Sequence, residues 1–253
     1  MKNNDVVSRF ISEGNPNAKI VGEGFTGDQK HLKHVLVPYE SRIIGALLPR
    51  VPRWMETTHL TLMTVLWSAG VVVSGYLARA DILWLWAFSA FIFLQYVTDM
   101  LDGAIGRARG TGLIKWGFYM DHFLDHMFLC AIVCGYSFLL PPSFMGLVLL
   151  GLAAAGGFMV HTFLDFSITG DFKISLGWFG VSEMRHVLII FNALVVFFGK
   201  ALLVNIFPFF IALLSVGLCA VVYRSQKLYA SVDMAVKREN DSPANEYMAV
   251  PAR

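Results

Sequence analysis

Long apolar blocks constrain this chain more than any other feature of its sequence. Six blocks follow one another, with approximate bounds 60–78, 82–98, 116–140, 144–164, 182–199 and 203–223. A helix needs about 17–25 apolar residues to cross a hydrocarbon core of ~30 Å. Each block meets that length, and only 15% of the residues are charged. We therefore expect an all-α integral membrane protein with six transmembrane helices.

The polar segments outside these blocks suggest how the chain is organised. Residues 1–35 are polar and lack the apolar stretch of a signal peptide, so we expect a cytosolic tail. Between residues 38 and 55, apolar side chains recur at helical spacing among Arg and Pro residues, which predicts an N-terminal interfacial amphipathic helix. The membrane domain is expected to cover residues 36–225. Residues 226–253 are polar and are expected to form a disordered cytosolic tail.

Lys and Arg are distributed unevenly about the six blocks. If the blocks cross the membrane in alternating directions, every Lys and Arg except Arg79 and Lys200 falls on the side of the N-terminus. Basic residues accumulate on the cytoplasmic side of membrane proteins. We therefore expect both termini in the cytoplasm, with the protein in the inner membrane if the cell is bacterial. The net charge of +2 is too small to indicate a nucleic-acid partner.

Four aspartates lie where the second block meets the third. Asp99 and Asp102 are three residues apart and share a helical face. Asp121 and Asp125 are four apart and share a face of the next helix. A glycine-rich turn between the two helices would make them antiparallel neighbours, so the four carboxylates could converge. Four ionised carboxylates beside hydrocarbon repel one another unless cations bind there.

The chemistry of this stretch suits divalent cations and phosphate. Mg²⁺ and Mn²⁺ favour carboxylate oxygens, and two such ions ~3.5–4 Å apart form a clamp for displacement at phosphorus. Gly103 leaves room for a ligand to approach the backbone. Arg107 offers a planar, permanently charged fork that matches phosphate.

Residues 99–125 resemble the signature of the CDP-alcohol phosphotransferase family. That signature reads D-x2-D-G-x2-A-R, then eight or nine residues, then G-x3-D-x3-D. The matching residues are Asp99, Asp102, Gly103, Arg107, Gly117, Asp121 and Asp125. Gly106 stands where the family usually has Ala. The six-span layout extends the resemblance over most of residues 40–225.

The resemblance implies an enzyme of phospholipid biosynthesis in the membrane, often a homodimer. Such an enzyme transfers a phospho-alcohol group from a CDP-alcohol donor to a hydroxyl acceptor and releases CMP. The donor would be CDP-diacylglycerol with a polar acceptor, or a CDP-choline-like or CDP-ethanolamine-like alcohol with a lipid acceptor. The D-H-x-x-D form around His122 is similar to the second kind. The basic residues near the fifth block favour the first kind, since Lys173, Arg109 and Lys115 could bind an anionic acceptor head group. Glu183 and Arg185, where the fifth block begins, are expected within or at the edge of the cavity.

The resemblance also implies roles for individual residues. Two divalent ions would be held by Asp99, Asp102 and Asp121, with Asp125 a ligand, the general base, or both. Cytidine and pyrophosphate would lie along Gly103, Arg107 and Gly117, and Thr61 keeps part of a nucleotide-contacting motif whose Asn is absent here. His122 is the alternative base, although it is turned ~100° from Asp121 on a helix.

Two other functions are compatible with a membrane protein that carries acidic residues. A divalent-cation transporter could use the same aspartates as an ion path. However, the acids cluster at one end of two blocks, and Arg107 would repel cations. A non-catalytic membrane scaffold would have no need to keep all four aspartates. The sequence therefore favours the phosphotransferase.

Overall fold

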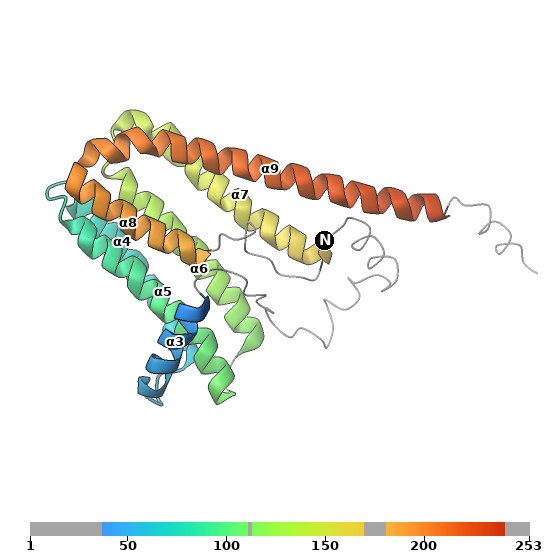
Figure 1. Ribbon diagram of the computed structural model, residues 1–253, viewed down its shortest axis with the longest axis horizontal. Coiled ribbons are helices and arrows are strands. Elements are labelled where there is room, and N and C mark those ends of the chain that lie inside the picture. Colours follow the sequence, from blue (N-terminus) through green and yellow to red (C-terminus); the bar gives the residue numbers. More distant parts are fainter. Residues whose placement is uncertain (1–36, 111–112, 170–180, 241–253) are drawn as a thin grey trace, which may run out of the picture.

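The computed structural model describes residues 37–110, 113–169 and 181–240, and within these ranges the chain is helical and has no strand (Figure 1). The helices, in chain order, are α3 (Val37–Leu47), the short η1 (Leu48–Arg50), α4 (Thr57–Leu77), α5 (Trp84–Arg109), α6 (Ile114–Ser137), the short η2 (Pro142–Phe144), α7 (Met145–Thr169), α8 (Val181–Phe198) and α9 (Lys200–Asn240). The expected all-α class is confirmed. Helices α4 to α9 follow the six apolar blocks one for one.

Four of these helices are long and apolar enough to cross a membrane. They are α4, α5, α9 and the continuous stretch of η2 and α7. Helices α6 and α8 are not among these four; α6 carries Asp121 and Asp125, and α8 carries Glu183 and Arg185, in their first halves. The chain is therefore an all-helical protein with four candidate spans in its described part. Spans at α6 and α8 stay a prediction.

Two glycines with positive φ set the positions where helices end. Helix α5 ends before Gly110, whose φ of 63° is left-handed. Gly199, with φ of 87°, is the single residue between α8 and α9. A side chain would strain either conformation, so glycine stops each helix at a defined residue.

Helix α4 packs against both α5 and α6, and these are the most extensive contacts between helices in the described part of the chain. Gly75 of α4 and Gly135 of α6 allow the two backbones to touch, since a Cβ on Gly75 would lie 2.6 Å from Gly135 Cα. Phe88 and Ile92 of α5 and Val71 of α4 are fully buried beside this contact. Small residues at a helix crossing permit this close approach.

Helix α8 completes the bundle by packing on α5, and a buried polar group fixes its position. Asn192 of α8 has no exposed surface. It accepts a hydrogen bond from the Tyr136 hydroxyl of α6 at 2.6 Å and donates to Ser89 Oγ of α5 at 3.0 Å. Buried polar groups in an apolar bundle are costly unless paired, so this network specifies one arrangement of the three helices.

The connection between α4 and α5 and the connection between α8 and α9 lie together at one end of the bundle. Lys200 Nζ, at the start of α9, donates to the backbone carbonyl of Arg79 at 2.7 Å, just after α4. Arg79 and Lys200 are the two basic residues that the alternating-span layout places on the other side of the membrane from all the remaining Lys and Arg. Their contact agrees with helices that alternate in direction.

Helix α9 corrects the expected boundary at residue 225. The helix continues to Asn240, so residues 226–240 are not a disordered tail. This segment contains no Gly or Pro, and Leu228 and Val232 recur at helical spacing, with Val232 buried. The Tyr229 hydroxyl also donates to Asp165 of α7. Residues 241–253, like residues 1–35, lie outside the described part of the chain.

Helix α3 is present where the sequence predicts a helix, and it packs on α5. Glu40 is buried and accepts a hydrogen bond from the Tyr96 hydroxyl at 3.1 Å. Trp54, which follows η1, is 67% exposed. The structure therefore has a helix here, whereas its amphipathic character and its position at a membrane interface stay a prediction.

Candidate metal centre

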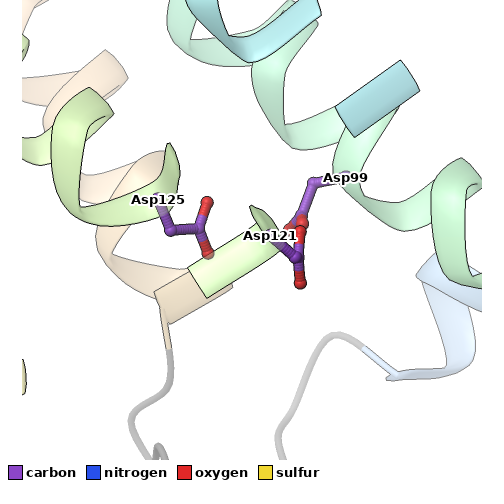
Figure 2. A group of neighbouring side chains, drawn as sticks. All are labelled: Asp99, Asp121 and Asp125. Carbon is purple, nitrogen blue, oxygen red and sulfur yellow. The ribbon is translucent and has the colours of Figure 1, made fainter. Parts of the chain in front are cut away.

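Three of the four predicted aspartates form one cluster. Asp99 lies on α5, and Asp121 and Asp125 lie on α6, and Figure 2 shows how the three carboxylates approach one another. One carboxylate oxygen from each residue lies within 4.8 Å of the others. The i, i+4 spacing places Asp121 and Asp125 on one face of α6, and that face is turned toward Asp99 of α5. We refer to these three residues as the aspartate cluster.

Asp102 lies one turn beyond Asp99 but makes a different contact. It is buried, and its Oδ2 accepts a hydrogen bond from the Thr61 hydroxyl of α4. Thr61 is therefore brought to the acidic motif, as a partner of Asp102. The structure thus brings Asp99, Asp121 and Asp125 together, whereas Asp102 is hydrogen-bonded to α4.

Arg185 of α8 bridges two members of the aspartate cluster. Its Nη1 lies 2.7 Å from Asp99 Oδ2, and its Nη2 lies 3.1 Å from Asp125 Oδ1. The residue is only 6% exposed. A buried guanidinium is costly unless carboxylates surround it, and here the cluster supplies them. The sequence placed Arg185 near the site but did not reveal this ion pair, because nothing in it specifies which face of α8 meets α5.

Gln95 is a site residue that sequence reasoning missed. It is 1% exposed, and its Nε2 donates to Asp125 Oδ1 at 2.9 Å. A usable signal was present, since Gln95 is a lone amide in an apolar block and lies one turn before Asp99 on the same helical face.

The buried oxygen of Gln95 tests whether the site fits a divalent ion. Within the described part of the chain, no hydrogen-bond donor reaches Gln95 Oε1. The amide group that carries this oxygen borders the aspartate cluster, because its Nε2 contacts Asp125. A buried acceptor without a donor is costly. Carboxylates and an amide oxygen are hard ligands of the type that Mg²⁺ and Mn²⁺ prefer, so the donor set fits such an ion.

Of the residues predicted to contact a nucleotide, Gly103, Arg107 and Gly117 lie on α5 and α6, whereas Thr61 lies on α4. Arg107 is exposed on α5, and its guanidinium lies over Gly103, where a Cβ would come within 3.1 Å of Nη1. The space at Gly103 is therefore used by Arg107. Gly117 on α6 has no atom within 4 Å of a Cβ position, so its surface is open. An exposed cation and an open glycine surface are compatible with an entering phosphate.

His122 is directed into an aromatic environment. It is buried, its Nδ1 lies 2.6 Å from the Phe118 carbonyl, and its ring lies 4.5 Å from the ring of Phe118 and 5.9 Å from that of Phe163 on α7. These contacts hold the imidazole on a different side of α6 from Asp121 and Asp125. The imidazole is therefore directed away from the aspartate cluster, whereas Asp125 belongs to it.

The other charged residues near the site have different surroundings. Arg109 donates to the backbone carbonyls of Met55 at 2.7 Å and Val51 at 3.0 Å, so it fixes the segment between η1 and α4. Lys115 is exposed at the start of α6. Lys173 lies outside the described residues. Glu183 is partly buried near the start of α8.

Comparisons with protein-family models, curated proteins and solved structures found no match for this chain. The residues of the motif and their arrangement in the structure are therefore what indicates a function for this chain.

Proposed function

We propose that this protein is a metal-dependent CDP-alcohol phosphotransferase of the membrane, which transfers a phospho-alcohol group to a hydroxyl acceptor and releases CMP. The observation that carries the proposal is the aspartate cluster, in which oxygens from α5 and α6 come within 4.8 Å of one another. The motif at residues 99–125 supplies the class of reaction. The open surface at Gly117 supports access for a phosphate ligand.

Two divalent ions, Mg²⁺ or Mn²⁺, would be held by Asp99, Asp102, Asp121 and Asp125. When bound, such ions neutralise the charge of a pyrophosphate. Arg107 would contact the donor phosphates, with Gly103 and Gly117 alongside. Thr61 orients Asp102 through its hydroxyl, which supports an indirect role for this residue at the site.

Asp125 would act as the general base. It accepts the acceptor hydroxyl's proton as the acceptor oxygen forms a bond to the β-phosphorus of the donor. The bond between that phosphorus and the oxygen shared with the α-phosphate breaks, and CMP leaves. Gln95 and Arg185 both donate to Asp125 Oδ1, so they fix the orientation of the carboxylate. Catalysis of this kind depends mainly on positioning and charge stabilisation.

The site would face the cytoplasm, together with both termini. The contact between Lys200 and Arg79 marks the opposite end of the bundle from the aspartate cluster. Reporter fusions after Arg253 and in the connection near Arg79 should therefore report opposite sides of the membrane. Identical sides would show that one span is misassigned.

Two pairs of donor and acceptor are compatible with this reaction. A soluble CDP-alcohol would be used with a lipid acceptor, or CDP-diacylglycerol with a polar acceptor. Because Arg185 is occupied by Asp99 and Asp125, it does not support binding of an anionic acceptor in the state described. The alternative functions, a divalent-cation transporter or a membrane scaffold, are less well supported, since the aspartates of the cluster come from two helices, α5 and α6, and trace no path across the membrane. A homodimer remains part of the proposal.

The test is release of CMP by the purified protein. The protein would be incubated with a panel of CDP-alcohols and hydroxyl acceptors in the presence of Mg²⁺. An Asp121→Asn variant provides the matched inactive control. We expect CMP with at least one donor and acceptor pair, and none with the variant. Absence of CMP across the panel, in a preparation that is folded and binds Mn²⁺, would contradict the proposal.

A further inference from the structure

We infer that Arg185 is the built-in counter-cation of the aspartate cluster, and that it opposes divalent-ion binding there. The inference concerns the metal centre of the proposed function and rests on that centre. Arg185 would act as a positioning residue that holds the carboxylates together before an ion arrives and sets how tightly the ion binds.

The geometry supports this role because one side chain joins three helices. Arg185 extends from α8 and contacts Asp99 on α5 and Asp125 on α6, at 2.7 and 3.1 Å. Both contacted residues belong to the cluster that could hold an ion. The guanidinium therefore lies directly beside the position that a divalent cation would take.

The charges explain why the guanidinium and a divalent ion oppose each other. Without Arg185, Asp99, Asp121 and Asp125 would place three negative charges within a few ångströms, in a partly buried environment where repulsion is poorly screened. The single positive charge of Arg185 relieves part of that repulsion. The same charge would repel a divalent ion bound to the same carboxylates, so its removal should strengthen ion binding.

A purely structural role predicts the opposite result. If Arg185 only held the ligands in the correct geometry, its loss would disorder the carboxylates and weaken ion binding. Gln95 helps to separate the two cases, since it also holds Asp125 through a hydrogen bond of 2.9 Å and remains when Arg185 is replaced. The sign of the change in ion affinity therefore distinguishes a counter-cation from a structural support.

The experiment compares Mn²⁺ binding by the full-length protein and its Arg185→Gln variant in detergent. Free Mn²⁺ would be measured by electron paramagnetic resonance, and thermal unfolding would be followed with and without Mn²⁺. We expect the variant to bind Mn²⁺ at least ~10-fold more tightly than the wild type, by the charge argument above. We also expect it to unfold at a lower temperature without metal and to gain more stability from Mn²⁺.

Two matched variants control for charge and for shape. Arg185→Lys keeps the positive charge without the fork, so its Mn²⁺ affinity should stay within about threefold of the wild type if charge is the cause. Arg79→Gln removes one positive charge at the opposite end of the bundle, where Arg79 lies 5.3 Å from the Tyr76 ring. It should leave Mn²⁺ affinity unchanged.

The outcomes decide the inference separately from the proposed function. Equal or weaker Mn²⁺ binding by Arg185→Gln, or a variant that stays unfolded even with Mn²⁺, would overturn the counter-cation role. If the variant binds more tightly while the wild type releases no CMP, the inference stands and the phosphotransferase fails. If CMP is released but Arg185→Gln binds no more tightly, the enzyme stands and the inference fails. Absence of Mn²⁺ binding in both proteins would overturn both.

Discussion

The bundle of α4, α5, α6 and α8 differs from the pair formed by α7 and α9 in what its helices bury. In the most apolar stretch of α5, 44% of residues are buried, against 11% in α9. The bundle buries polar groups as well, including Asn192, Gln95 and Arg185. Figure 1 shows α7 and α9 running side by side, with α9 extending well past the bundle. The pair exposes large apolar side chains such as Phe209 and Leu213.

This difference indicates where the chemistry can be built. Charged and amide side chains at membrane depth need partners, and the bundle supplies them from several helices at once, as around Asn192 and Arg185. The α7–α9 pair offers apolar surface that suits lipid or another apolar partner. Substitutions in the two regions should therefore have different consequences.

Among changes to the bundle, removal of divalent metal should have the largest effect on activity. Because the aspartate cluster is expected to act only with bound ions, EDTA should abolish CMP release, and added Mg²⁺ or Mn²⁺ should restore it. The measurement is CMP release before and after chelation. Full activity in a metal-free preparation would rule out the two-ion centre.

Replacement of the proposed base should have the next largest effect. Asp125→Asn removes the proton acceptor but keeps a side chain of similar size, so we expect donor binding to persist and turnover to fall by ~10²-fold or more. His122→Ala is the comparison, because His122 lies against Phe118 and Phe163 and should be dispensable for proton transfer. Donor affinity and turnover would be measured separately. Normal binding with lost turnover in His122→Ala alone would reverse the assignment of the base.

Two glycine substitutions compare packing in the two regions directly. A Cβ on Gly75 would lie 2.6 Å from the backbone of Gly135, between α4 and α6. A Cβ on Gly157 of α7 would also lie 2.6 Å from its nearest atom, but that atom is the end of the flexible Leu218 side chain on α9. Gly75→Ala should therefore destabilise the protein by about 1–3 kcal/mol, and Gly157→Ala by clearly less. Thermal unfolding in one detergent would check the ranking, and equal effects would contradict it.

The smallest effect is expected on the exposed face of α9. Leu213 is 71% exposed, so Leu213→Ala removes little packing within the chain. We expect a change in stability within about 0.5 kcal/mol and unchanged CMP release. A large loss of stability would show that another part of the protein, or a second copy, covers this face.

The sequence by itself determined the helices and the composition of the motif. Apolar length predicts α4 to α9, because a helix satisfies its own backbone hydrogen bonds in an apolar surrounding. Helical periodicity predicts that Asp121 and Asp125 share a face, since 3.6 residues per turn is a local property. The extension of α9 to Asn240 was also available from residues 226–240, which lack Gly and Pro, but their polarity was interpreted as disorder.

Only the tertiary structure decided which side chains meet across helices. Arg185 is 60 residues from Asp125 along the chain, and Gln95 is 30 residues away, yet both donate to the same carboxylate oxygen. Thr61 likewise meets Asp102 rather than the aspartate cluster. The rotation and depth of each helix are set by packing at contacts such as Gly75 with Gly135 and by the buried Asn192 network. Because these constraints act between helices, the periodicity of any one helix cannot specify them.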